Sequence, residues 1–241
     1  MKILWLYYDL MNLYGENGNI RCLTRRLANQ GVESELLCRS LGDDLSFDDV
    51  DLLYIGAGTE RSQKAALEHL RPYAQDLRAA MERGMHALLT GNAGSLLCRE
   101  ITDASGKVWP GLGLLDFTCH EQANTTRRTG DVIARLPDLS EPLVGFINTS
   151  EEWEDILTTQ PLFKMLLGSG NHTGSELEGY RRGNFLATHL TGPVLVKNPA
   201  FHTWLLRRLL GHEPAPVSYP YEEKAWQVTL DALREQEHLE L

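Results

Sequence analysis

Residues 85–94 have the sequence MHALLTGNAG, a short apolar run that ends in two glycines placed on either side of Asn92. The apolar run predicts a buried strand over residues 85–90, and the small residues after it predict a sharp turn into a helix at 95–98. Such an elbow needs small neighbours, because the chain doubles back and the elbow residue is pushed outward. Catalytic groups in open α/β sheets gather at the carboxyl ends of strands. Asn92 therefore stands where such a scaffold would present a nucleophile.

The sequence before the elbow alternates between short apolar runs and helical periodicity. We expect strands at 2–8, 32–38 and 50–55, a helix at 19–29, and helical structure at 60–83 that Pro72 divides in two. This order predicts an α/β fold with a mainly parallel sheet and helices on both of its faces.

The second half of the chain is different in character. Strands are expected at 108–116, 131–135, 144–147 and 185–189, and a helix at 198–210. Three prolines between residues 211 and 220 predict a linker, followed by a terminal helix at 222–239 that docks on the body or on a partner. We therefore divide the chain into a domain, residues 1–210, and a proline-rich linker with a C-terminal helix, residues 211–241.

Composition excludes several classes of function. The chain of 241 residues carries a net charge of −10 and has no basic stripe, which argues against a nucleic-acid partner. Its four cysteines form no CxxC pair, so neither a metal site nor a redox pair is indicated, and no cofactor is expected. The apolar N-terminus is too short for a signal peptide or a membrane span. These features predict a cytoplasmic protein with reduced thiols.

A second glycine-containing turn follows the strand at 50–55. It supplies backbone N–H groups from Ala57 or Gly58, while Ala93 supplies the N–H after the elbow. Donors placed in this way suit an oxyanion that develops during acyl transfer. The two turns together predict an oxyanion site.

Several short motifs, in a consistent order, resemble one known family. They include Met11-Asn12-Leu13-Tyr14, Ile55-Gly56-Ala57-Gly58 followed by Glu60, Arg61 and Gln63, Gly111 to Phe117, Arg127/Arg128 with Thr129-Gly130-Asp131, Gly170-Asn171, and Gly192-Pro193 with Lys197-Asn198. The chain resembles the CobB/CobQ-like class I glutamine amidotransferases, and among them the glutaminase subunit of lipid II isoglutaminyl synthase. The resemblance runs to about Leu210.

This resemblance implies a flavodoxin-like fold and a specific chemistry. Members carry a cysteine nucleophile on the elbow and a histidine shortly before the Gly-Pro pair. The cysteine attacks the glutamine amide, and the released ammonia passes to a Mur-ligase-like (MurT-type) partner that amidates a peptidoglycan precursor. The resemblance also implies that Arg127 holds the carboxylate of a small amino-acid ligand.

The sequence departs from this pattern at both catalytic positions. Asn92 replaces the cysteine, and Thr191 replaces the histidine. A carboxamide nitrogen is a poor nucleophile because its lone pair is delocalised, and threonine is no base near neutral pH. We therefore expect a catalytically degenerate glutaminase.

Two side chains are the candidates for rescuing the chemistry. Cys98 lies six positions beyond the elbow and is expected to be buried in the helix. His189 lies two positions before Thr191, which in a strand places both side chains on the same face.

Three hypotheses stay open on the sequence alone. The first is a pseudo-glutaminase that serves as a scaffold or regulatory subunit of a Mur-ligase-like protein. The second is an active amidotransferase with a displaced catalytic group. The third is a binding module for an amino acid or peptide, in which Arg127 points into the pocket and not out to the surface.

Overall fold

A six-stranded sheet forms the centre of the molecule in the computed structural model, which describes residues 1–154 and 160–239. Its strand order is β13-β14-β4-β3-β1-β2. The strands are Tyr180–Arg182, Phe185–Thr188, His86–Thr90, Leu52–Ile55, Lys2–Leu6 and Glu35–Arg39 in that order. All neighbours pair in parallel except β13 and β14. The predicted mainly parallel sheet is confirmed.

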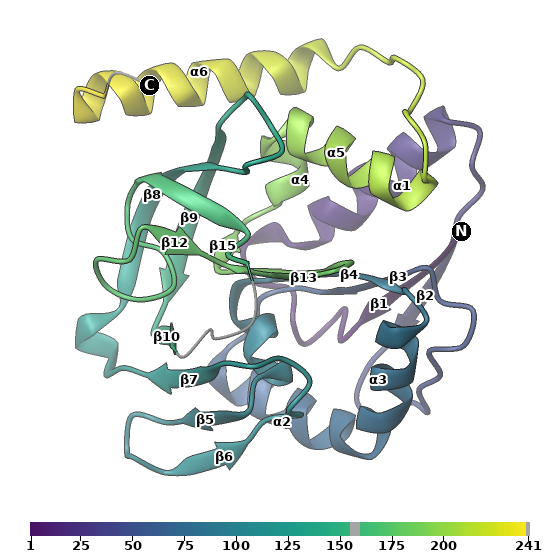
Figure 1. Cartoon of the computed structure of the whole chain (residues 1–241), viewed down its shortest axis with the longest axis vertical. Helices are drawn as coiled ribbons and strands as arrows, with labels where there is room; N and C mark the ends of the chain where they lie inside the picture. Colours follow the sequence, from purple (N-terminus) through teal and green to yellow (C-terminus); the bar gives the residue numbers. More distant parts are fainter. Residues whose placement is uncertain (155–159, 240–241) are drawn as a thin grey trace.

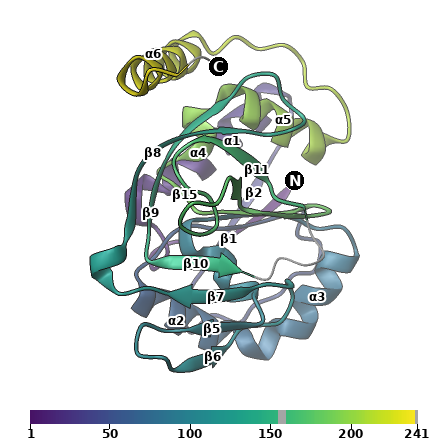
Figure 2. The same ribbon diagram turned by 60° about the vertical axis from the view of Figure 1, so that its left-hand side comes forward.

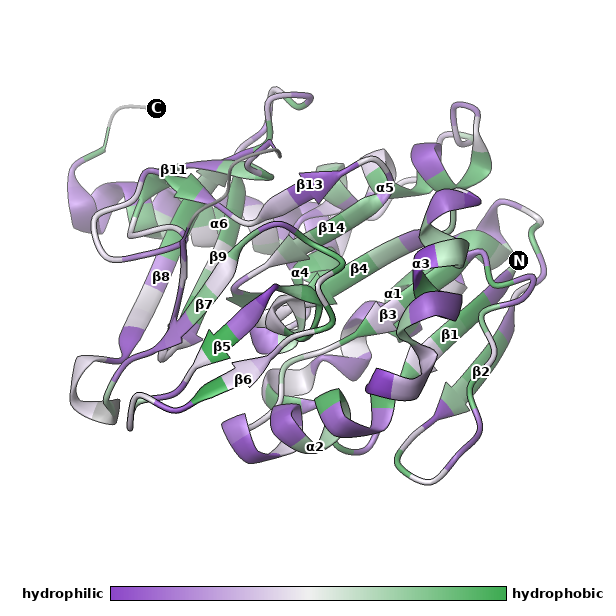
Figure 3. Ribbon diagram, turned by 60° about the horizontal axis from the view of Figure 1, so that its bottom comes forward, coloured by the Kyte–Doolittle hydropathy of each residue, from purple (hydrophilic) through white to green (hydrophobic). Residues whose placement is uncertain are grey.

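Helices cover both faces of this sheet, as Figure 1 shows. One face carries α1 (Asn17–Asn29), α4 (Val194–Lys197) and α5 (Pro199–Leu210), and the other carries α2 (Glu60–Leu70) and α3 (Ala74–Glu82). A 3-10 turn, η2 (Arg71–Tyr73), separates α2 from α3 at the predicted proline break. Strands β3 and β4 lie between these layers, and their near-continuous apolar sequence follows from burial on both sides. Figure 3 shows them as hydrophobic ribbons.

Two smaller sheets stand beside the central one, and the sequence analysis had not grouped them. One has the order β10-β7-β5-β6 and comprises Glu151–Glu154, Thr118–Glu121, Glu100–Thr102 and Val108–Pro110. The other has the order β12-β11-β8-β9-β15 and comprises Leu177–Glu178, Phe163–Leu167, Arg128–Arg135, Leu143–Thr149 and Leu190–Thr191. Figure 2 shows the strands of the first small sheet one below another, from β10 through β7 and β5 to β6, with β9 above them.

Two sequence predictions near these sheets were wrong. The strand expected at 108–116 ends at Pro110, because the segment after it turns back to bond with Arg99, Leu96 and Cys98 through its backbone N–H groups. The helix expected at 95–98 is instead a 3-10 run, η3 (Gly91–Leu97), that starts at the elbow itself. Leu112, Leu114 and Leu115 donate their backbone N–H groups to the carbonyls of Leu96 and Leu97 at the end of this run.

The C-terminal segment returns to the body. Residues 211–219 cross to α6 (Pro220–Glu237), which packs Leu230 and Leu233 against Ile133 of β8 and Val144 of β9. Trp226 donates its indole N–H to the carbonyl of Pro142 at 3.0 Å. The docking of the terminal helix on the body is confirmed.

Candidate functional site

The elbow after β4 is built around Gly91. This glycine adopts a left-handed φ of +61°, and a Cβ added to it would lie 2.4 Å from the Cβ of Ala57. Asn92 is not among the non-glycine residues with positive φ. The left-handed backbone conformation of the elbow is therefore adopted by a glycine, which tolerates it, and the backbone of Asn92 does not share it. Asn92 is 9% exposed, and it lines the pocket at the elbow.

The carboxamide of Asn92 is bonded to the opposite turn. Its Oδ1 accepts the backbone N–H of Gly58 at 2.9 Å, and its Nδ2 donates to the Gly58 carbonyl at 3.0 Å. The Gly58 N–H is one of the three backbone donors, with those of Ala57 and Ala93, that the sequence suggested for the oxyanion site. This donor is already satisfied by the side chain at the nucleophile position. We call this pair of hydrogen bonds the Asn92–Gly58 clasp.

The elbow pocket is nearly filled as a result. Its walls include Tyr14, Ala57, Gly58, Asn92 and Thr191, and its free volume is about 10 Å³. That is close to the minimum that one water molecule needs, and far below the cavity volume of about 300–1,000 Å³ that is typical of small-molecule sites. Ala93 is fully buried and is not among the lining residues. A hollow of about 470 Å³ exists elsewhere, between α5 and α6, but no elbow residue lines it.

Thr191 lies beside the elbow and lines the same pocket as Gly91 and Asn92. A Cβ built on Gly91 would be 3.2 Å from the Cγ2 of Thr191, so the Thr191 side chain packs against the backbone of Gly91. Its hydroxyl donates to the carbonyl of Phe146 at 3.2 Å, across the pairing of β15 with β9. The two positions that depart from the family pattern therefore face one pocket, and neither carries a thiol or an imidazole.

Arg127 also lines this pocket, and its guanidinium is occupied. It bonds Glu60 Oε1 at 2.9 Å and Asn148 Oδ1 at 2.5 Å. Burial acts to raise the pKa of the Glu60 carboxyl, but hydrogen bonds from its own backbone N–H, Arg127 and Ser150 lower it below the usual range. Glu60 therefore stays ionised and supplies the carboxylate that a bound amino acid would otherwise offer. Arg127 points into the pocket and not out to the surface.

A buried carboxyl that the sequence analysis missed lies directly behind the elbow. Glu151 accepts from Gln63 Nε2 at 2.6 Å, and its other oxygen accepts from Ser95. Gln63 Nε2 also donates to the carbonyl of Asn92 at 2.7 Å, so it links this carboxyl to the elbow. Desolvation raises the pKa of Glu151 to about 7. Glu151 occurs in the run Glu-Glu-Trp-Glu, where alternation in a strand could have indicated one inward carboxyl.

A second buried carboxyl that the sequence analysis missed, that of Glu16, bonds to several residues beside the pocket. Glu16 is fully buried and accepts hydrogen bonds from Tyr54 and Thr90 at 2.5 Å each, from Asn19 at 3.1 Å and from the Gly192 N–H at 3.0 Å. Desolvation raises its pKa, and these donors oppose that shift. The network joins the ends of β3 and β4 to the turn after Thr191, so the pocket walls hold a fixed spacing.

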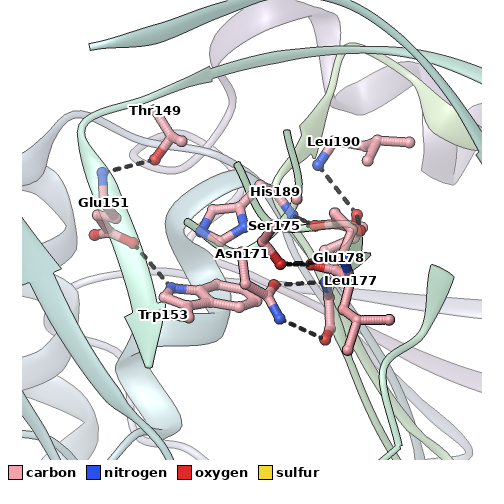
Figure 4. Close-up of polar contacts among 12 residues, drawn as sticks. Thr149, Glu151, Trp153, Asn171, Ser175, Leu177, Glu178, His189 and Leu190 are labelled. Atoms are coloured by element: carbon pink, nitrogen blue, oxygen red, sulfur yellow. Dashed lines mark hydrogen bonds and ion pairs between the residues drawn. The ribbon is translucent and has the colours of Figure 1, made fainter. Parts of the chain in front are cut away.

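Neither candidate for rescue reaches the pocket. His189 lies between β14 and β15, in neither strand, so the expected shared face with Thr191 does not exist. Its ring lies against that of Trp153, with centroids 3.8 Å apart and the ring planes tilted by 37°, and its Nδ1 lies 3.4 Å from Glu178 Oε1 (Figure 4). Cys98 is buried, as expected, and burial raises the pKa of its thiol. Among the described residues that line the pocket there is neither a cysteine nor a histidine.

Other features of the described chain bear on its class of function. Over residues 1–154 and 160–239, no group of three or more His, Cys, Asp or Glu side chains is arranged to hold a metal ion. None of the helices in those ranges has the length and apolar character needed to cross a bilayer.

Comparison with known proteins agrees with this architecture. The model of the CobB/CobQ-like glutamine amidotransferase domain matches residues 2–199. The GatD subunit of the glutamine-hydrolysing lipid II isoglutaminyl synthase from Staphylococcus aureus (strain N315) is 30% identical over 98% of both chains. The corresponding GatD from Streptococcus pneumoniae (strain ATCC BAA-255 / R6) is 28% identical over 82% of this chain and 76% of the relative.

Solved structures share the fold. A glutamine amidotransferase crystal structure aligns with a TM-score of 0.57 at 16% identity, covering 86% of this chain and 98% of the other. PurLQS from Thermotoga maritima aligns with a TM-score of 0.55 at 16% identity, covering 96% and 98%. The class I amidotransferase-like fold and the resemblance to GatD, both inferred from the sequence, are confirmed.

Proposed function

The chain belongs to the CobB/CobQ-like glutamine amidotransferase family, and from this premise we propose that it is a pseudo-glutaminase. It keeps the shape of a glutaminase subunit but does not hydrolyse glutamine. It acts in the cytoplasm as a scaffold or regulatory subunit of a Mur-ligase-like (MurT-type) protein that amidates a peptidoglycan precursor.

The Asn92–Gly58 clasp is the observation that carries this proposal. An acyl transfer at this elbow needs a nucleophile, a base and free oxyanion donors. Asn92 removes the nucleophile and also engages the Gly58 N–H through its Oδ1. Thr191 replaces the base. One substitution thus disables two parts of the chemistry, and the remaining volume of about 10 Å³ leaves no place for a substrate amide.

The preserved scaffold supports a role in an assembly. Similarity to the S. aureus subunit extends over 98% of the chain, although both catalytic side chains differ from those the family's chemistry requires. The buried networks around Glu16 and Glu151 also hold the pocket walls in place without a reaction to serve. A subunit whose role is only to bind a partner protein needs its fold and its surface, and it can lose its nucleophile without losing that role.

The two other hypotheses have less support. A displaced catalytic group would have to be His189 or Cys98, and neither lines the pocket. A binding module for an amino acid would need Arg127 to be free, whereas Glu60 is bonded to it at 2.9 Å. An incoming carboxylate would have to displace Glu60 and open the clasp.

The source of nitrogen tests the proposal. The chain is co-expressed with a Mur-ligase-like (MurT-type) protein and supplied with ATP and the lipid-linked precursor. One reaction contains glutamine labelled with ¹⁵N in the side-chain amide and unlabelled ammonium, and the other reverses the labels. We expect ¹⁵N in the product only from ammonium. Label transferred from glutamine would refute a pseudo-glutaminase, and failure of the two proteins to co-purify would refute the proposed partner.

A further inference from the structure

The two edges of the central sheet are protected differently. At one edge, the backbone N–H of Arg181 in β13 donates to the carbonyl of Gln160 at 2.9 Å, so another segment covers that strand. At the other edge, β2 pairs with β1 alone. Figure 3 shows β2 as the outermost strand of the sheet. An uncovered edge is a template for pairing with another chain.

Alternate peptide groups of β2 face outward. Glu35 donates its N–H to Met1, and Arg39 accepts from Tyr7, so both residues bond toward β1. In a parallel pair the bonding direction alternates, which leaves the peptide groups of Leu36 and Cys38 pointing away from the sheet. The guanidinium of Arg39 caps the Cys38 carbonyl at 2.8 Å, as expected for an acceptor without a strand partner.

The strand is also self-complementary in charge. Its sequence is Glu-Leu-Leu-Cys-Arg, with Leu37 at the centre. If two copies run antiparallel about Leu37, Glu35 of each lies opposite Arg39 of the other, and Leu37 lies opposite itself. Within residues 1–154 and 160–239, neither Glu35 nor Arg39 has an ion-pair partner. Leu36, on the other face, is 38% exposed.

We propose that a second copy of this chain docks on β2, in antiparallel register about Leu37, and so joins two central sheets into one. Leu36 and Cys38 then exchange backbone hydrogen bonds across the twofold axis. Two Glu35–Arg39 ion pairs flank a Leu37–Leu37 contact. The strand β2 is three strands away from β4 and its elbow, so this surface is separate from the pocket of the proposed function.

Charge reversal gives a sharp test on the full-length chain. Sedimentation velocity at physiological salt, from micromolar to submillimolar protein, should detect a dimer of twice the 27.1 kDa chain mass. E35R and R39E each place two like-charged pairs across the axis, and each should weaken dimerisation about tenfold or more. The double variant E35R/R39E restores both pairs and should dimerise as the wild type does. E141R, with the same change in charge on a distant loop, is the control.

Mixing the two single variants separates an effect of charge from a folding defect, because misfolded variants would not dimerise with each other either. E35R mixed with R39E forms two attractive pairs in the heterodimer, so the mixture should dimerise more strongly than either variant alone. L37C should also form an intermolecular disulfide under mild oxidation, because its Cα atoms would be about 4.5 Å apart. A monomer at every concentration would overturn the proposal. A dimer indifferent to these charges, or a Mur-ligase-like partner protecting β2 in its place, would do so as well.

Discussion

The substitution Asn92→Ala tests the Asn92–Gly58 clasp directly. It removes both hydrogen bonds to Gly58 and leaves the N–H and carbonyl of that residue without their present partners. A neutral hydrogen bond contributes about 0.5–1.5 kcal/mol net, so the two together stabilise the fold by about 1–3 kcal/mol. Water can enter the space that the carboxamide vacates, which places the expected loss in the lower half of that range.

Urea denaturation followed by tryptophan fluorescence measures this loss. For a chain of this size, 1 kcal/mol corresponds to a shift in Tm of about 2–4 °C, so a thermal melt gives a second estimate. Asn29→Ala is the matched control, because its side chain makes one exposed hydrogen bond, to the hydroxyl of Tyr219. It should cost less than about 0.5 kcal/mol.

The isosteric variant Asn92→Asp adds a test of direction. One carboxylate oxygen can still accept the Gly58 N–H. The other oxygen replaces Nδ2, which in the wild type donates to the Gly58 carbonyl, so two acceptors then face each other. Asn92→Asp should therefore be less stable than the wild type at pH 7 and recover in part when acid protonates it. If Asn92→Ala and Asn29→Ala cost the same, the clasp does not stabilise the elbow and the reasoning fails.

Two further predictions concern the surroundings of the elbow. The pKa of Glu151 lies near 7 in the fold and near 4.5 when unfolded, so its stabilising contribution is complete below about pH 4.5 and is lost as the pH rises through 7. Between pH 5 and 8 the wild type should lose up to about 3 kcal/mol relative to Glu151→Gln in urea titrations, and parallel curves would contradict this. Gly91→Ala should cost about 2–4 kcal/mol, from the left-handed φ and from overlap with Ala57. Gly113→Ala, with the same φ of +61° and nothing within 4 Å, should cost only about 1–2 kcal/mol, and equal losses would show that the overlap relaxes.

The sequence predicted the elbow because its signals are local. An apolar run that ends in Gly91 and Gly94 specifies a strand and a tight turn without reference to the rest of the chain. The positions of Asn92 and Thr191 were likewise found from short motifs. The predicted strands β1, β3 and β4 followed from the continuous apolar runs that burial on both faces requires.

The clasp could not be predicted because it joins distant residues. Asn92 and Gly58 were both identified, but nothing in a linear sequence indicates that a side chain bonds to a backbone 34 residues away. Glu151 was missed because its neighbours are acidic, so the run resembles a solvated strand. The partners of its buried carboxyl are Ser95 of η3, Gln63 of α2 and Trp153 of the same strand. Two of these partners are distant in sequence, so the burial could not be read from the local run.

The release of ammonia from glutamine tests the central claim most directly. Wild-type protein, with and without the proposed Mur-ligase-like partner, is compared with the double variant N92C/T191H, which places a thiol and an imidazole at the two pocket positions and frees the Gly58 N–H. We predict no release by the wild type above the background of the unfolded protein, and measurable release by the double variant. Turnover by the wild type at an ordinary enzymatic rate, retained in Asn92→Ala, would contradict the account.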